Sequence, residues 1–174
     1  MKKLILSLVA LFSMAGFSLA QKTAYVDLDY ILANIPEYKK AQDELDKIAA
    51  QWQKEIEMKF AEVDKLYKAY EAEEILLTEE MKKKRKDEII AKEKEAKELQ
   101  KQRFGVDGDL FKKRQEMIKP IQDKVYNAIK AICDKEQIMI MFNKSADMNI
   151  LYANAKFDKS DAVLESMGYK PGAK

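Results

Sequence analysis

The sequence predicts a mainly α protein with a small β-sheet, in which a long antiparallel helical hairpin projects from a small β-rich oligomerisation body. Three observations predict this fold. Residues 37–104 contain no Gly, Pro, Ser or Asn, so they form one helix-favouring stretch whose single break is Thr78. The limbs on either side of Thr78 match in length, and short apolar runs typical of strands lie before and after them.

Residues 1–20 have the composition of a secretory signal peptide. Lys2 and Lys3 precede an apolar run from Leu4 to Phe12, and small residues follow at the positions that a signal peptidase reads. An uncleaved anchor is the less favoured alternative, because the run is short and is followed by polar and small residues. We therefore expect cleavage after Ala20 and export to the periplasm.

The composition of the remaining chain bounds its chemistry. Without the two signal lysines, 30 basic residues face 30 acidic ones, and a neutral total argues against nucleic acid as a partner. The chain has no His and a single Cys, Cys133, so it has no intrachain disulfide. Small exported proteins often need such staples, and oligomerisation is the remaining source of stability.

The outgoing limb is predicted as one helix from about Pro36 to about Leu76. Thr78 then precedes two acidic residues, as expected of an N-cap followed by a first helical turn, so a second helix begins after it. Apolar residues of the first helix recur with a mean period close to 3.6, which gives one stripe for one partner helix. This stripe comprises Leu45, Ile48, Trp52, Ile56, Phe60, Val63, Tyr67 and Tyr70.

The two limbs are too long and too thin for a globular domain. Residues 37–77 and 79–119 each number 41, and at 1.5 Å per residue each limb reaches roughly 60 Å. We therefore divide the chain into a hairpin arm, residues 37–119, and an oligomerisation body formed by residues 21–36 and 120–174.

The return limb contains residues that disfavour a helix. Gly105 and Gly108 interrupt it, Asp109 is available as a fresh N-cap, and Pro120 follows. The two glycines are candidates for a hinge, and a local kink without a mechanical role is the alternative.

The body is predicted to hold three short strands. Residues 23–27 form one, residues 28–34 a short helix, residues 137–153 two further strands, and residues 161–167 a helix capped by Ser160 and ended by Gly168. Strands with open edges pair readily between copies, so we expect subunits to pool their apolar faces. The candidate oligomer core is Val26, Ile121, Val125, Ile129, Ile132, Ile138, Ile140, Phe142 and Leu151.

Signals of an enzyme are missing from the sequence. There is no His to act as a base or metal ligand, no nucleophile paired with a base, and no phosphate-binding glycine loop. The carboxylates alternate with lysines, as on solvated helix faces. We predict no catalytic, cofactor-binding or metal-binding residue, and an inert, buried thiol at Cys133.

Four segments together resemble the Skp/OmpH family of periplasmic chaperones: AYVDLDYILANIPEYKKAQDEL, LFKKRQEMIKPIQDKVYNAIKAI, IMIMFNKS and DKSDAVLESMG. The resemblance implies a homotrimer with a small β-barrel-like core and three helical arms around a cavity. It further implies an ATP-independent holdase that carries unfolded outer-membrane β-barrel proteins. Transient contact with a membrane surface stays open, and a scaffolding coiled-coil protein that binds a folded partner is the alternative.

A holdase must bind many sequences weakly, which adaptable Met and aromatic side chains allow. Packing within the hairpin is the competing explanation for the residues on the stripe, so the leucines at the turn are the stronger candidates. The candidate client-binding residues are Met58, Phe60, Tyr67, Tyr70, Leu76, Leu77 and Met81.

Overall fold

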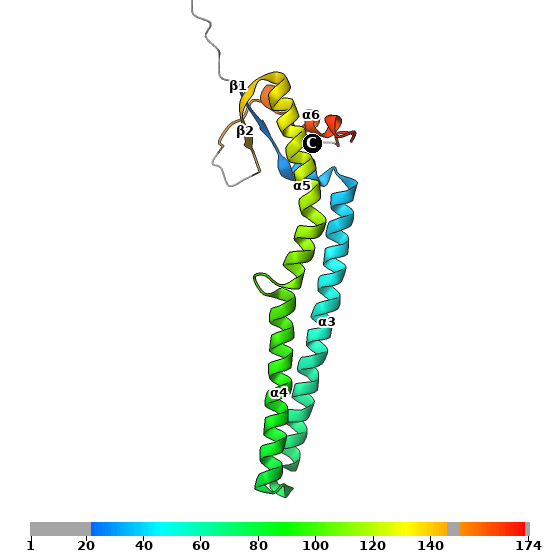
Figure 1. Ribbon diagram of the computed structural model, residues 1–174, viewed down its shortest axis with the longest axis vertical. Coiled ribbons are helices and arrows are strands. Elements are labelled where there is room, and N and C mark those ends of the chain that lie inside the picture. Colours follow the sequence, from blue (N-terminus) through cyan, green and yellow to red (C-terminus); the bar gives the residue numbers. More distant parts are fainter. Residues whose placement is uncertain (1–21, 146–149, 173–174) are drawn as a thin grey trace, which may run out of the picture.

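The computed structural model describes residues 22–145 and 150–172, which form a slender arm joined to a small body (Figure 1). The predicted signal peptide lies outside these residues. Within the described ranges, no helix combines the length and apolar character that crossing a bilayer requires. The mainly α fold with a small sheet, predicted from the sequence, is confirmed.

The first elements of the body form as predicted. Strand β1 (Lys22–Val26) leads into helix α2 (Leu28–Ala33) through Asp27. Asp27 is extended, and its carboxylate accepts a hydrogen bond from the backbone N–H of Tyr30 at 3.0 Å. This bond satisfies one of the N–H groups that a helix leaves unpaired at its start, which fixes where α2 begins.

The arm is an antiparallel pair of helices. Helix α3 (Pro36–Glu73) runs outwards and helix α4 (Glu79–Phe104) returns beside it (Figure 1). They are joined by a short 3₁₀ helix, η1 (Glu74–Leu76), and by Thr78, whose hydroxyl accepts a hydrogen bond from the Met81 N–H at 3.3 Å. The predicted turn and its N-cap are therefore confirmed.

The return limb is interrupted at residues 105–108 and continues as α5 (Asp109–Glu136). The predicted N-cap at Asp109 is wrong by one position: Gly108 is the N-cap, and Asp109 is the first helical residue. The Asp109 carboxylate is bound at 2.7 Å by the guanidinium of Arg103, across the interruption, rather than by the backbone of its own helix.

Pro120 lies inside α5 without ending it. A proline in a helix interior removes one backbone hydrogen bond and costs about 3 kcal/mol. Its neighbours Ile118, Ile121 and Val125 are buried in the body, and burying large apolar side chains contributes about 1.5–3 kcal/mol each. Packing therefore outweighs the proline, and the helix passes through it.

The sheet consists of two parallel strands. Strand β2 (Ile138–Asn143) pairs with β1, with Thr23 opposite Ile140 and Tyr25 opposite Phe142. Parallel neighbours need a long crossover connection, which is usually a single helix. Here the whole arm, α3 to α5, is that crossover, so pairing of the sheet fixes both ends of the arm.

The second strand predicted after the hairpin is wrong over residues 150–154, which form no strand, and residues 146–149 lie outside the described part. The chain next forms a 3₁₀ turn, η2 (Ala155–Phe157), and then a single bridge between Tyr25 and Asp158. Apolar alternation shows that a segment can be extended, whereas a strand also needs a hydrogen-bonding neighbour.

Helix α6 (Ser160–Ser166) packs against the body, and Ser160 is not its cap as predicted. Ser160 is fully buried within the first turn; its hydroxyl accepts from the Asp27 N–H at 2.9 Å and donates to the Asp158 carboxylate at 2.6 Å. It therefore joins α6 to the start of α2. The predicted end is confirmed, since Gly168 takes the left-handed conformation at φ 84°.

The hydrophobic core lies where α2, the start of α3, α5, the sheet and α6 meet. Ile31, Val163 and Leu164 have no exposed surface there, and Leu45 of α3 is 2% exposed. Farther out, the buried apolar residues among those described are Ile56, Tyr70 and Ala96. The body therefore has a contiguous core, whereas the arm beyond it has only a few separate buried side chains.

Most of the residues predicted to form the oligomer core belong instead to the core of the single chain. Five of the nine predicted residues are buried within the single chain: Val26, Ile121, Val125, Ile132 and Ile138. A sixth, Ile129, is partly buried and packs against the same core. Their burial needs no second copy. Ile140, Phe142 and Leu151 lie outside this core, so the surface available for pooling between subunits is smaller than predicted.

Candidate functional site

The arm tip presents apolar side chains that neither helix covers. Ile75 is 95% exposed and Leu76 is 85% exposed, and both lie in the 3₁₀ turn η1 that joins α3 to α4. Met81 is half exposed, whereas Leu77 is partly buried. Sequence reasoning missed Ile75, although it belongs to the same apolar run as the two predicted leucines.

A groove, here called the distal groove, runs between α3 and α4 near the tip and has a volume of about 710 Å³. The exposed apolar side chains on it are Tyr67 from α3, 52% exposed, and Ile90 from α4, 61% exposed. Sequence reasoning missed Ile90 because the return limb has no strong apolar period. The groove is lined by Phe60, Val63, Asp64, Tyr67, Tyr70, Glu71, Glu74, Lys86, Ile89, Ile90 and Glu93.

Tyr70 belongs to the hairpin interior rather than to an exposed surface. It is 7% exposed, its hydroxyl donates to the Glu74 carboxylate at 2.6 Å, and the Lys86 ammonium lies 5.4 Å from its ring centre. The hydrogen bond to Glu74 is the main cause that raises the pKa of Tyr70, followed by burial. The other predicted arm residues differ: Met58 is 58% exposed, and Phe60 is half-buried in the distal groove.

The basic run at 82–86 is partly engaged within the arm. Lys82 binds Glu79 at 2.9 Å and Arg85 binds Glu73 at 3.4 Å. The hydrogen bond to Glu79 raises the pKa of Lys82. The Arg85 pair joins α4 to α3 across the turn, whereas the Lys82 pair lies within α4, so part of the basic run is engaged within the arm and Lys83 and Lys84 remain exposed.

The two candidate hinge residues are glycines because other backbone atoms approach them closely. A Cβ at Gly105 would clash with the carbonyl oxygen of Lys101, and one at Gly108 would lie 2.8 Å from that of Gln102. Real Cβ atoms essentially never come so near. Both glycines therefore permit one tight loop, and neither has a positive φ.

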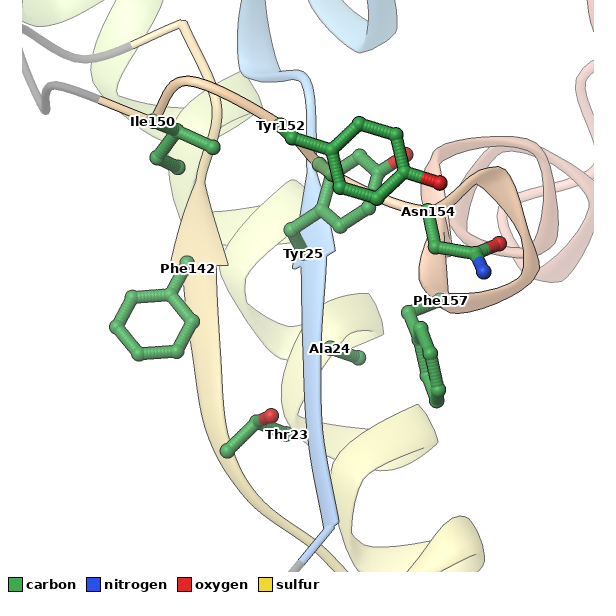
Figure 2. Close-up of a pocket in the computed structure, with 9 residues that line it drawn as sticks. Thr23, Ala24, Tyr25, Phe142, Ile150, Tyr152, Asn154 and Phe157 are labelled. Atoms are coloured by element: carbon green, nitrogen blue, oxygen red, sulfur yellow. The ribbon is translucent and has the colours of Figure 1, made fainter.

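The body carries a second apolar surface, here called the sheet groove, with a volume of about 310 Å³. Figure 2 shows Phe142 on β2 at one side, with Tyr152 and Phe157 from the following segment around β1. Around it Leu151 is 99% exposed, Tyr152 82% and Ile140 50%. The groove is lined by Thr23, Ala24, Tyr25, Phe142, Ile150, Tyr152, Ala153, Asn154 and Phe157.

No group of three or more His, Cys, Asp or Glu side chains that could hold a metal ion occurs within the described ranges. Burial raises the pKa of the Cys133 thiol, which keeps it protonated and poorly reactive. The tip and the two grooves are open and expose apolar side chains, in the distal groove beside charged ones, which suits binding of other chains.

The family model for OmpH-like outer membrane proteins matches residues 22–167, which span the strand, the arm, the second strand and α6. The chain belongs to the OmpH-like family. A crystal structure from Caulobacter crescentus CB15, described as an outer membrane chaperone (OmpH-like), is similar in fold, with a TM-score of 0.66. The two are 16% identical, and the match covers 87% of this chain and 86% of that one. No curated protein matches the sequence.

The OmpH-like family resemblance stated from the sequence is thereby confirmed. At 16% identity the similarity to the Caulobacter structure concerns the fold alone. The exposed tip, the distal groove and the sheet groove are features of this OmpH-like chain and are not inferred from the Caulobacter structure.

Proposed function

We propose that this OmpH-like protein is an ATP-independent periplasmic holdase, which assembles as a homotrimer and holds unfolded outer-membrane β-barrel proteins between its arms. The observation that carries the proposal is the arm: two helices without a globular core, whose apolar side chains concentrate uncovered at the tip and in the distal groove. In an oligomer, a long arm of this kind would line one side of an enclosed space.

Weak contacts suffice when several act on one chain. An unfolded client touching one arm stays at a high effective concentration near its neighbours, so retention exceeds the affinity of any single contact. Release then needs no nucleotide, because each contact alone is feeble. The tip residues Ile75, Leu76 and Met81 and the groove residues Tyr67 and Ile90 are the contact groups that exposure favours.

The sheet groove supports self-association. Ile140, Leu151 and Tyr152 expose apolar surface beside a two-stranded sheet, and so small a sheet is marginal without further partners. Pairing of copies about a symmetry axis would cover this surface in each subunit. Three copies is the number that the family resemblance implies, and cleavage after Ala20 is part of the same proposal.

The proposed division into arm and body needs one adjustment. Ala41 and Leu45 of α3 and Ile118 of α5 belong to the body core, although we assigned residues 37–119 to the arm. The adjustment has a mechanical consequence, because each limb is anchored in the body by buried side chains.

Aggregation of a urea-diluted outer-membrane β-barrel protein tests the function. Processed protein at one trimer per client is expected to keep the client soluble without nucleotide, and light scattering measures it. Unsuppressed aggregation at that ratio would contradict a holdase. A scaffolding protein, by contrast, would retain one folded partner in a pull-down and leave the unfolded client to aggregate.

A further inference from the structure

Arg103 lies at the point where the return limb is interrupted, and it contacts three elements. It is the second-last residue of α4, and its guanidinium binds the Asp109 carboxylate at the start of α5 at 2.7 Å. The same group lies 4.5 Å from the ring centre of Trp52 on α3 and 3.7 Å from the Glu55 carboxylate, also on α3. One side chain therefore bridges α4, α5 and α3.

The environment of Arg103 is more buried than that of the other arm ion pairs described. Its side chain is 24% exposed and that of Asp109 is 26% exposed, whereas the tip pair of Arg85 and Glu73 is 43% and 49% exposed. A charge pair out of bulk water is screened less, so it holds its geometry more firmly. The buried Nε of Arg103 has no acceptor among the described residues, which is the cost of placing the guanidinium over the Trp52 ring.

The loop beside Arg103 is equally constrained. Gly105 donates its N–H to the Lys101 carbonyl at 2.8 Å, and Gly108 donates to the Gly105 carbonyl at 2.9 Å. A Cβ at either glycine would meet backbone atoms within 3 Å. The loop is thus a tight, hydrogen-bonded turn that only glycine permits, and not a slack segment.

We infer that Arg103 is a positioning residue that latches the joint between α4 and α5, so that the distal arm is held at a fixed angle to the body. The joint bends only when the guanidinium leaves Trp52 and Asp109. This replaces the predicted glycine hinge: the glycines allow the joint's shape, and Arg103 holds it. Only one consequence of the inference rests on the proposed function: in the trimer, the angle of each arm would set the width of the space between the arms.

The latch requires arginine rather than any cation. A planar guanidinium stacks on an indole ring while its edge binds a carboxylate, and it reaches a second carboxylate from the same plane. The ammonium of a lysine is compact and strongly hydrated, so it would keep part of the attraction to Asp109 and make a weaker contact with Trp52. Arg103→Lys is therefore expected to be intermediate between the wild type and Arg103→Ala.

Electron spin resonance between two labels tests the latch directly. Labels at Lys94→Cys on α4 and Lys119→Cys on α5, in a Cys133→Ser background, report the angle of the joint; both native lysines are largely exposed. Labelled chains are refolded with an excess of unlabelled chains, so that only distances within one chain are read. The matched control is Arg85→Ala, which removes the other arginine that links α4 to α3 in an ion pair, away from the joint.

The wild type and Arg85→Ala are expected to give one narrow distance distribution, and Arg103→Ala and Trp52→Leu a clearly broader one. Hydrogen exchange of the Gly105, Gly108 and Lys112 amides should be at least about tenfold faster in Arg103→Ala, with unchanged overall helicity by circular dichroism. An Arg103→Ala distribution as narrow as the wild type would overturn the inference. So would a wild-type distribution as broad as that of the variant.

These readouts need no client, so they separate the latch from the holdase function. If Arg103→Ala broadens the distance distribution but the wild type fails to suppress aggregation, the latch is supported and the holdase function is contradicted. If the wild type suppresses aggregation but Arg103→Ala leaves the distribution narrow, the holdase function is supported and the latch is contradicted.

Discussion

At the scale of single residues, exposure separates apolar side chains that support the arm from those that are free to bind. Tyr67 and Tyr70 lie three positions apart on α3, yet Tyr70 is 7% exposed and hydrogen-bonded to Glu74, whereas Tyr67 is 52% exposed. The sequence placed both on one stripe. A helical period identifies a face, but the partner helix decides how much of that face it covers.

The tip residues are the first test at this scale. Ile75→Ser with Leu76→Ser is expected to leave assembly and helicity unchanged, because both side chains are almost fully exposed, and to weaken retention of an unfolded client several-fold. Competition for a fluorescent client measures retention. Val106→Ser, at an apolar residue 91% exposed but away from the tip, is the control, and equal losses in both variants would remove the tip's special role.

A pH-dependent contact joins the last part of the chain to α3. The Tyr169 hydroxyl donates to the Glu37 carboxylate at 3.0 Å. The pKa of Glu37 is lowered first by a backbone hydrogen bond at the helix start and second by this tyrosine. Because the pKa of Glu37 is lower in the folded chain than in the unfolded chain, this carboxylate stabilises the fold at pH values above its unfolded pKa. That stabilisation is lost as the pH falls through the folded pKa.

Tyr169→Phe is therefore expected to move the pKa of Glu37 up towards its usual value in an NMR titration. The variant should be less stable than the wild type in urea at about pH 7, and the difference should shrink at about pH 3. A stability difference that stays constant across this range would show that the hydroxyl acts through packing and not through the carboxylate.

At the scale of elements, local caps set the starts of α2 and α4, whereas tertiary packing decided the role of Ser160 at the start of α6. Thr78 caps α4 as its residue type and its acidic followers predict. Ser160 has the same cap chemistry, but its hydroxyl is taken by Asp27 and Asp158 from other parts of the body. Exposed caps act locally, whereas a buried hydroxyl goes to whichever partners surround it.

Thr78→Ala should cost about 1 kcal/mol at the start of α4 because it removes the acceptor for the Met81 N–H. Hydrogen exchange of the first α4 amides should then be about fivefold faster, since 1 kcal/mol corresponds to roughly that factor. Thr78→Ser retains the hydroxyl and should exchange as the wild type does. Unchanged exchange in the alanine variant would mean that η1 alone defines the turn.

At the scale of the whole molecule, the arm is the crossover of a parallel two-stranded sheet (Figure 1). The body is held by a core within one chain, so a separated subunit is expected to keep its fold even though its sheet groove would be open. We therefore predict that folding does not depend on assembly in this protein, although the sequence suggested that the body needs partner strands.

Ile140→Asp tests this separation. Ile140 is 50% exposed in the single chain, so the charge is tolerated there, but it would be buried unpaired if copies pack on this face. Analytical ultracentrifugation should show smaller species, with helicity retained. Val106→Asp, at an apolar residue that is 91% exposed in the loop between α4 and α5 and lies away from the sheet, is the control. An intact oligomer in Ile140→Asp would place the interface elsewhere.

Sequence by itself determined the arm of this protein: its two helices, the Thr78 turn and the approximate length of each limb follow from local propensity over a stretch without helix breakers. Tertiary structure decided what depends on distant neighbours. It decided that residues 150–154 form no strand, that Val26 and Val125 are buried in their own chain, and that Arg103 reaches Trp52 and Asp109. The physical reason is range, because helix hydrogen bonds join residues four apart, whereas sheet partners, core contacts and the Arg103 latch join residues that only folding brings together.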